Sequence, residues 1–276
     1  MKKLITDDIK EQKILERIRN YRLIDDEFMT KFFENELECT SIVLQIILEN
    51  PTLKVISSVS QANIKNLHGR SLRLDVKATD STGKIYDIEI QRASSGAKPK
   101  RARYHSSLLD ANELNIGDDV DNLPETFVIF ITENDIVGDG LPVYYVARRY
   151  SHSLALFGDE TNIIYVNGSF RGDTPIGNLM HDFNCSNPAE MKNKVLAKRA
   201  GNLKGIEKED YMVNKPIHEF IQEVFGDDIQ AAKEEQTKEI ILEMLKKNCP
   251  FDFISSVTKF PVEKIKSIAE EAVATV

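Results

Sequence analysis

Apolar and polar residues alternate along two neighbouring segments of the chain, residues 70–79 and 85–92. The apolar positions are Leu72, Leu74, Val76 and Ala78 in the first segment, and Tyr86, Ile88 and Ile90 in the second. A period of two residues is typical of a half-buried strand. Residues 80–84 between them include turn-forming residues and a glycine. The pattern therefore predicts a β-hairpin with one apolar and one polar face.

The polar face of this hairpin places two carboxylates opposite each other. If the hairpin is symmetric about Thr82, its pairs are Thr79–Ile85, Lys77–Asp87, Asp75–Glu89 and Arg73–Gln91. Lys77 and Asp87 form a favourable pair. Directly opposed Asp75 and Glu89 would repel each other at a Cβ separation of about 4.5–5.5 Å. Such a pair needs a shared proton or a cation. A solvated polar face is the alternative, because a slip of one residue would move every side chain.

The pattern predicts further elements on both sides of the hairpin. Helices are expected at residues 7–21, 25–49, 100–114, 177–183 and 188–203, and strands at 54–60, 126–132, 143–149 and 162–166. Asp25 and Asp26 are suitable N-cap residues for the second helix. The run at 126–132 is apolar almost throughout, as in a strand buried on both faces. This order predicts an α/β core with a mixed sheet.

The last part of the chain is more charged and predicts helices only. They are expected at residues 216–225, 228–247, 252–257 and 261–273. The last two resemble a helix-turn-helix loosely, but their acidic charge argues against a DNA-reading role. A small packing or oligomerisation appendage is the commoner explanation. We therefore predict an N-terminal helix in residues 1–24, a main domain in 25–204 and a helical region in 205–276.

Composition narrows the class of protein without identifying it. The 276 residues are 41% hydrophobic and 29% charged, which is typical of an ordinary globular protein. Neither a secretory signal nor a run of 18 apolar residues is present in the sequence, so we expect no membrane span. Three well-separated cysteines argue for a reducing, cytoplasmic location and against a disulfide framework. The five histidines show no metal-ligand spacing.

Positive charge gathers directly after the hairpin, although the net charge of the chain is −8. Residues 90–109 contain no acidic residue, and their cations are Arg92, Lys98, Lys100, Arg101 and Arg103. Pro99 suits the first turn of a helix. On that helix Arg101, Tyr104 and His105 can share one face. The segment is either a solvated cationic helix face or a phosphate-binding surface beside the carboxylates.

Several stretches of the chain together resemble a known family. They are Asp25-Asp26-Glu27-Phe28-Met29, Gly69-Arg70-Ser71-Leu72-Arg73-Leu74-Asp75, Asp87-Ile88-Glu89-Ile90-Gln91, Lys100-Arg101-Ala102-Arg103-Tyr104-His105-Ser106-Ser107, Leu123-Pro124-Glu125-Thr126, Val128-Ile129-Phe130-Ile131-Thr132-Glu133, Tyr165-Val166-Asn167-Gly168 and Leu179-Met180-His181-Asp182-Phe183. Their order and spacing resemble the PD-(D/E)XK nuclease superfamily, and within it the Rpn-like recombination-promoting nucleases, also described as transposases. The resemblance covers residues 25–204.

The resemblance implies a fold and an activity. The fold would be a restriction-endonuclease-like core, with a mixed central sheet flanked by helices and a small C-terminal helical appendage. The activity would be metal-dependent cleavage of double-stranded DNA. Asp75 and Glu89 would bind Mg²⁺, with Mn²⁺ as a substitute, and Gln91 occupies the usual lysine position. Glu38, or with less support Glu34, would be the acidic residue contributed by the first helix.

The resemblance also implies a DNA-binding surface and leaves one departure to explain. Lys100, Arg101, Arg103 and Tyr104 would contact the DNA, and the C-terminal helices could join copies of the chain. A lysine supplies positive charge beside the scissile phosphate, whereas the neutral Gln91 can only orient a water molecule. The alternative function is therefore a weakly active or inactive nuclease fold that acts as a DNA-binding or regulatory module.

Overall fold

The computed structural model describes residues 14–66, 69–205 and 215–274. The chain divides into two compact units, Met1–Ile217 and His218–Val276, which are described separately below. Residues 14–20 are helical, and the earlier part of the helix predicted at 7–21 lies outside the described residues. The predicted three-part division of the chain stays a prediction.

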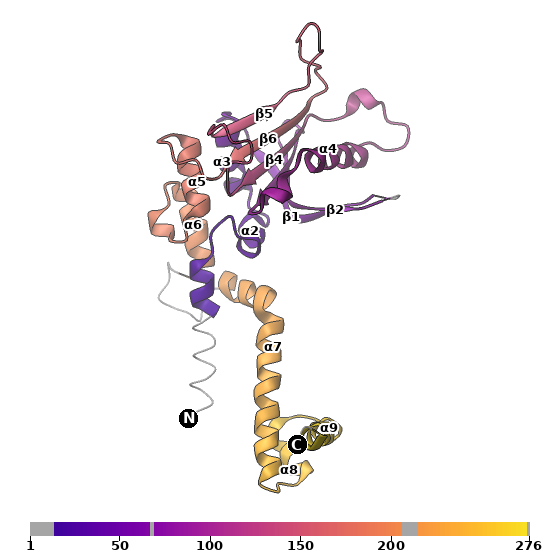
Figure 1. The fold of residues 1–276 in the computed structure, drawn as a ribbon, viewed down its shortest axis with the longest axis vertical. Helices are drawn as coiled ribbons and strands as arrows, with labels where there is room; N and C mark the ends of the chain where they lie inside the picture. The colour runs from indigo at the N-terminus through magenta and orange to yellow at the C-terminus, as the bar shows by residue number, and fades with distance from the viewer. Residues whose placement is uncertain (1–13, 67–68, 206–214, 275–276) are drawn as a thin grey trace. The chain divides into compact units, whose positions relative to one another are not determined.

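The first unit is built on a mixed six-stranded sheet (Figure 1). Its order is β1-β2-β3-β4-β6-β5, with β1 at Val55–Ile64, β2 at Leu72–Asp80, β3 at Ile85–Gln91, β4 at Thr126–Thr132, β5 at Val143–Val146 and β6 at Thr161–Asn167. Strands β1, β2 and β3 pair antiparallel, β3, β4 and β6 pair parallel, and β5 returns antiparallel to β6. The predicted mixed sheet and α/β class are thus confirmed.

Helices cover both faces of this sheet. They are α2 at Asp26–Phe33, α3 at Leu37–Ile47, α4 at Pro99–Glu113, α5 at Pro175–Asn184 and α6 at Lys194–Leu203, with short 3₁₀ turns at Ser94–Ala97, Val120–Asn122 and Pro188–Glu190. Neighbouring residues of a strand point to opposite faces. Lys77 of β2 pairs with Glu113 of α4, whereas the next residue, Ala78, lies opposite Ser58, which contacts Thr40 of α3. Helices α3 and α4 therefore flank the sheet.

The long helix predicted at residues 25–49 is in fact two helices, α2 and α3. The break includes Asn35, whose φ of 54° is left-handed and cannot continue an α-helix. Asparagine adopts this conformation more readily than most residues because its short polar side chain can hydrogen-bond locally. The apolar stripe continues across the break, which is why the pattern did not reveal it. Helix α2 can therefore take its own direction against β1 and β2.

Two groups of apolar side chains hold the first unit together. The cluster beneath α4 contains Ile64, Leu74, Ile85, Ala97, Ala102, Leu108, Leu109, Val128, Phe130 and Tyr165, all buried. A second, aromatic group includes Phe28, Phe32 and Phe33 of α2 and its end, and Phe183 of α5, with ring centroids 5.0–6.3 Å apart. Burial of side chains of this size stabilises a fold by roughly 1.5–3 kcal/mol each. The first cluster thereby holds α4 against the sheet, and the second joins α2 to α5.

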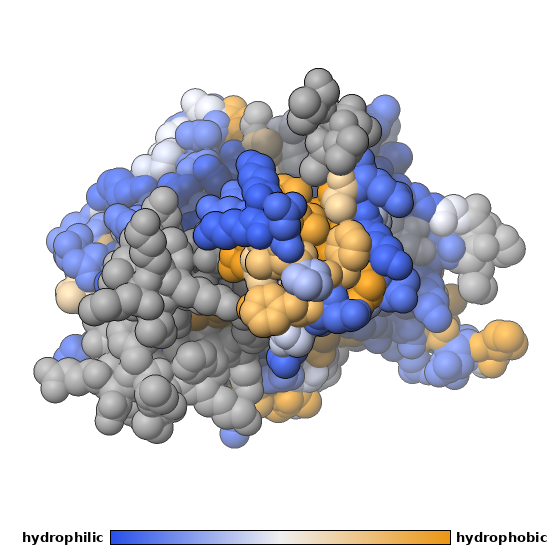
Figure 2. Space-filling model, turned by 90° about the horizontal axis from the view of Figure 1, so that it is seen from below, coloured by the Kyte–Doolittle hydropathy of each residue, from blue (hydrophilic) through white to orange (hydrophobic). Residues whose placement is uncertain are grey.

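The second unit consists of helices. The two helices predicted at 216–225 and 228–247 form one helix, α7 at Lys215–Lys246, followed by α8 at Phe251–Thr258 and α9 at Val262–Ala274. Its core contains Ile241, Ile254, Ile265 and Ile268. Figure 2 views the molecule from below, where apolar side chains gather in a patch beside hydrophilic ones. In α8, Phe251, Phe253 and Val257 remain 38–54% exposed. Of the helices described, none is both long and apolar enough to cross a membrane.

Candidate active site

The β2–β3 hairpin brings Asp75 and Glu89 together where its strands separate. The ladder runs from Thr79↔Ile85 to Val76↔Ile88, so the predicted Lys77–Asp87 pair forms. The predicted pairs beyond it, Asp75–Glu89 and Arg73–Gln91, lie past the end of this ladder.

Side-chain acceptors take the place of backbone ladder bonds at this open end. The amide of Asp75 donates to Oε1 of Glu89 at 3.0 Å, and the amide of Ile90 donates to Oδ2 of Asp75 at 2.8 Å. Each carboxylate is thus anchored to the backbone of the opposite strand. The two acidic side chains converge as expected, although by a different pairing.

These two carboxylates lie where a negative charge is costly. Glu89 is fully buried and Asp75 is partly buried. Burial is the largest cause that raises the pKa of Asp75, and the negative charge of Glu89 is the second. The negative charge of Asp26 raises this pKa further. Burial, and then the charge of Asp87, raises the pKa of Glu89. The pair therefore favours binding of a proton or a cation.

Asp87 has a different partner from the one that its ladder position suggested. Lys77 lies opposite Asp87, but its Nζ pairs with Glu113 of α4 at 2.7 Å. Oδ2 of Asp87 instead lies 2.7 Å from Nδ1 of His105, and both side chains are fully buried. Burial, and then the charge of Asp75, raises the pKa of Asp87, whereas burial lowers the pKa of His105. Helix α4 therefore closes over the polar face of the hairpin.

Arg101 is the cation that α4 brings to this cluster. Its Nη2 lies 2.8 Å from Oε2 of Glu89, and its Nε donates to Nε2 of His105 at 3.2 Å. Arg101 and His105 are four residues apart, so they lie on the same face of the helix. The Arg101 side chain is 40% exposed, so its guanidinium joins the buried cluster to the surface.

Gln91 lies beside Glu89 at the last position of β3. Its Nε2 is 3.4 Å from Oε2 of Glu89. Its Oε1 lies against Gly96 in the 3₁₀ turn Ser94–Ala97, so closely that a Cβ at Gly96 would be 2.0 Å away. The amide of Gln91 is therefore held between a carboxylate and a glycine.

The other residues predicted to bind DNA lie along α4. Lys100 and Arg103 are exposed. The hydroxyl of Tyr104 donates to the carbonyl of Arg70 at 2.5 Å and accepts from Asn66 Nδ2 at 3.0 Å. Tyr104 thereby joins α4 to the connection before β2. Contact of these side chains with DNA stays a prediction.

The acidic residues expected from the first helix lie apart from the carboxylate pair. Glu34 pairs with Lys31 at 2.7 Å, and Glu38 is exposed in the first turn of α3. Within the described chain, Glu38 makes no hydrogen bond or ion pair with Asp75 or Glu89, and its role as a ligand stays a prediction. Asp26, in the first turn of α2, is instead close enough for its charge to raise the pKa of Asp75.

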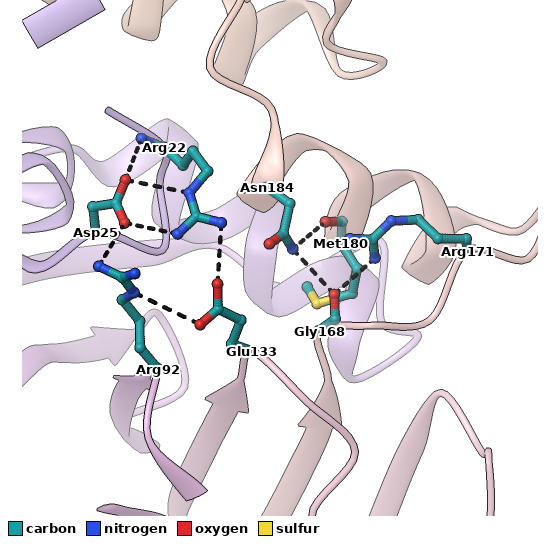
Figure 3. Close-up of polar contacts among 8 residues, drawn as sticks. All are labelled: Arg22, Asp25, Arg92, Glu133, Gly168, Arg171, Met180 and Asn184. Atoms are coloured by element: carbon teal, nitrogen blue, oxygen red, sulfur yellow. Dashed lines mark hydrogen bonds and ion pairs between the residues drawn. The ribbon is translucent and has the colours of Figure 1, made fainter. Parts of the chain in front are cut away.

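An ion-pair network fixes the start of α2, and hence Asp26, to the ends of β3 and β4 (Figure 3). Arg22 lies 3.0 Å from both Asp25 and Glu133, and Arg92 lies 3.3 Å from Asp25 and 3.6 Å from Glu133. Asp25 is the residue before α2, as predicted, but its carboxylate makes no capping bond to the helix. Two cations and two anions balance each other here.

The donor set of the candidate site fits a divalent metal ion. Asp87, Glu89 and His105 offer ligand atoms within 4.8 Å of one another, and all three are buried. Asp75 supplies a further carboxylate, hydrogen-bonded to the strand that carries Glu89. Carboxylate oxygens suit Mg²⁺ and Mn²⁺, and an imidazole nitrogen suits transition metals.

Sequence reasoning missed the roles of Asp26, Asp87 and His105. The alternation in β3 already places Asp87 on the face of Glu89. For His105, the available signal was its position four residues after Arg101 on a helix next to the hairpin. A search for His-rich metal-ligand spacing could not find it, because its partners come from a strand 16 and 18 residues earlier.

Comparison with known protein families places the chain in one of them. Residues 28–167 match the family model described as PD-(D/E)XK nuclease family transposase. The match begins within α2 and includes the hairpin, α4, β4 and β6, and therefore contains Asp75, Glu89 and Gln91. Neither the curated proteins nor the solved structures contain a significant match. The family model covers half of the chain, and the chain belongs to the PD-(D/E)XK nuclease family of transposases.

Proposed function

We propose that this protein is a divalent-metal-dependent endonuclease that hydrolyses phosphodiester bonds of double-stranded DNA. The observation that carries the proposal is the convergence of Asp75 and Glu89 beneath a basic helix. Among the described residues, Glu89 forms an ion pair with Arg101, and no lysine pairs with either carboxylate. Two such carboxylates suit Mg²⁺, or Mn²⁺ in its place.

Each residue of the site has a role in this proposal. Asp75 and Glu89 hold the metal ion, and Asp26 at the start of α2 adds negative charge nearby. When bound, the ion supplies a hydroxide nucleophile near neutral pH and offsets negative charge on the phosphate. Gln91 orients the attacking water through its amide. Arg101 contacts the phosphodiester, and the exposed Lys100 and Arg103 contact its neighbours.

A cleavage assay tests this proposal directly. Supercoiled and linear duplex DNA are incubated with the protein in Mg²⁺, in Mn²⁺ and with EDTA. We expect metal-dependent cutting by the wild type and a loss of roughly 100-fold or more in Asp75→Asn, comparable to removal of one catalytic group in other enzymes. A failure of the wild type to cut varied duplexes with either metal would contradict the proposal.

Gln91 supports a second candidate function. Without the lysine charge, the fold could bind DNA and regulate access to it without cutting. This alternative predicts DNA binding that survives Asp75→Asn and weakens in the double variant Arg101→Ala and Arg103→Ala. The same DNA in a mobility-shift assay separates the alternatives, because the endonuclease proposal requires product formation and the regulatory one does not.

The wider setting of the reaction is inferred from the family. A role in DNA recombination follows from the transposase description, and a cytoplasmic location stays the prediction made from the separated cysteines. The exposed apolar side chains of α8, Phe251, Phe253 and Val257, support self-association through the C-terminal helices. Sedimentation of the wild type and of Phe253→Ser at several concentrations tests this part of the proposal.

A further inference from the structure

The guanidinium of Arg101 occupies a position between two groups that can bind metals. Its Nη2 lies 2.8 Å from Oε2 of Glu89, and its Nε lies 3.2 Å from Nε2 of His105. A cation thus already bridges a carboxylate oxygen and an imidazole nitrogen. The Arg101 side chain is 40% exposed, so it can leave this position toward solvent without unfolding the core.

The hydrogen bonds of His105 define which of its nitrogens is available. A guanidinium only donates hydrogen bonds, so the Nε2 that faces Arg101 must be an acceptor. The proton of the neutral ring is then on Nδ1, which donates to Oδ2 of Asp87 at 2.7 Å. Metal-binding histidines characteristically donate their other N–H to a carboxylate in this way. His105 is therefore already held in the orientation of a metal ligand.

The charges around this position are not balanced. Asp75, Asp87 and Glu89 are three carboxylates, and among the described residues Arg101 forms an ion pair with one of them, Glu89. Lys77 lies nearby but pairs with Glu113. Oδ1 of the fully buried Asp87 has no hydrogen-bond partner. A buried carboxylate in this state is stabilised by added positive charge.

We propose that Nε2 of His105 is a nitrogen ligand of the metal ion, that Asp87 orients it, and that Arg101 leaves this place to the ion. This inference rests on the metal dependence proposed above and extends it to the identity of the ligands. The ion then binds to Asp75, Glu89 and His105, and the displaced guanidinium of Arg101 is free to contact a phosphate. Arg101 would thus couple metal binding to DNA binding.

A nitrogen ligand changes which metal the site prefers. Mg²⁺ favours oxygen ligands, whereas imidazole suits first-row transition metals. The site should therefore bind Mn²⁺ more tightly than Mg²⁺ by a margin that depends on His105. A histidine that served only to bridge Asp87 and Arg101 within the fold would give no such dependence.

Pulsed electron paramagnetic resonance of Mn²⁺ bound to the full-length wild-type protein tests the central claim without any variant. A directly bound imidazole gives a resolved ¹⁴N coupling, and we expect to observe it. Mn²⁺ that binds in an Asp75-dependent manner without this coupling would overturn the inference about His105 and leave the proposed endonuclease intact. Absence of Mn²⁺ and Mg²⁺ binding altogether would overturn both.

Two substitutions, one in each member of the His105–Asp87 pair, provide the matched test by calorimetry. The asparagine of His105→Asn can still donate a hydrogen bond to Asp87, but it has no atom at the position of Nε2. We therefore expect a loss of Mn²⁺ affinity of ~10-fold or more. The affinity for Mg²⁺ should fall less, so the preference for Mn²⁺ shrinks. Asp87→Asn should weaken Mn²⁺ binding by ~10–100-fold, as loss of an outer partner does at other metal sites. Equal losses for both metals in His105→Asn would contradict the inference.

Competition by Arg101 gives an independent test. In the absence of DNA, Arg101→Ala should bind Mn²⁺ several-fold more tightly than the wild type, because the ion no longer has to displace a guanidinium. Lys98→Ala removes one exposed positive charge just before the same helix and is the control for general electrostatics. Equal effects of the two substitutions would contradict the displacement of Arg101.

Discussion

Strand β2 carries an aspartate just beyond each end of its ladder with β3, and the two are in opposite electrostatic situations. At the turn, Asp80 accepts from the amide and hydroxyl of Thr82, the amide of Lys84 and the hydroxyl of Tyr86, at 2.7–3.1 Å. Burial raises the pKa of Asp80, but these hydrogen bonds outweigh it, so the net pKa is lowered. At the open end, burial and the charge of Glu89 raise the pKa of Asp75.

The difference separates a structural carboxylate from a candidate functional one. Asp80 is 4% exposed, so both aspartates lose water, but only Asp80 has enough donors to compensate. Three donors from the turn and one from β3 stabilise its charge. Asp75 has one backbone donor and faces other carboxylates, so its charge is best compensated by a bound cation. Burial alone therefore does not identify a site, whereas burial with too few donors does.

The largest expected effect comes from replacing the carboxylate at the open end. Asp75→Asn keeps an acceptor for the amide of Ile90 and removes a negative charge beside Glu89. We expect cleavage to fall by roughly 100-fold or more, while the free energy of unfolding without metal stays the same or rises. Cleavage rates and urea denaturation of the same preparation measure both. A variant that lost stability and activity together would instead place Asp75 with Asp80 as a structural residue.

Replacing the aspartate at the turn should have the opposite pattern. Asp80→Asn removes the negative charge and leaves the four donors with one acceptor oxygen in place of two. We expect a loss of about 1–3 kcal/mol of stability at pH 7. The pKa of Asp80 is lower in the folded state than in the unfolded state. The ionised carboxylate therefore contributes its full stabilisation above the unfolded-state pKa of about 3.9. This stabilisation is lost as the pH falls through the lower folded-state pKa.

Urea denaturation of the wild type and Asp80→Asn from pH 7 to pH 3 measures this difference. The two proteins should converge below about pH 4. Asp139→Asn, at an exposed aspartate of a surface loop, makes the same charge change and should alter stability by less than about 0.5 kcal/mol. A difference between wild type and Asp80→Asn that grew toward acid would contradict the assigned direction of the pKa shift.

The network of Arg22, Asp25, Arg92 and Glu133 is a second example of compensated charge (Figure 3). The Arg22 side chain is 26% exposed and contacts both carboxylates at 3.0 Å, whereas Arg92 is 58% exposed and more distant from them. We expect Arg22→Ala to cost about 1–2 kcal/mol of stability and Arg92→Ala less than about 1 kcal/mol. Thermal denaturation of both variants measures the order, and an equal or reversed order would show that Arg22 does not dominate the network.

The residue pairs of the hairpin could be predicted from the sequence near the turn but not at the open end. The pairs Lys77↔Asp87 and Thr79↔Ile85 lie near the turn, whose length sets the register, and both were predicted. Past Val76 the ladder ends, because the carboxylates of Asp75 and Glu89 replace backbone acceptors. Alternation of residue types carries no information on such a replacement.

The packing of α4 explains the remaining differences. Lys77 faces Asp87 on the sheet, but the helix offers Glu113 to the lysine and His105 to the aspartate. A pairing that depends on how a helix crosses a sheet cannot be derived from strand periodicity. The basic helix itself and its place after the hairpin were predicted, because Pro99 and the charge run are local signals. Fold class and the identity of Asp75 and Glu89 as candidates were thus accessible, but their polar surroundings were not.

A smaller effect on cleavage than that of Asp75→Asn is expected at Gln91, the residue that β3 places beside Glu89. Gly96 does not have a left-handed φ, so Gly96→Ala is compatible with the backbone, but its Cβ would lie 2.0 Å from Oε1 of Gln91. The flexible amide must then move, so we expect unchanged stability and a fall in cleavage of ~10-fold, or about 1.4 kcal/mol. The exposed neighbour Ser95 provides the control Ser95→Ala, which should cleave like the wild type.

A double variant tests whether Gly96 acts by positioning Gln91. If it does, Gly96→Ala combined with Gln91→Ala should cleave no more slowly than Gln91→Ala alone, because the effects of coupled residues are not additive. Additive losses would mean that Gly96 affects the site by another route.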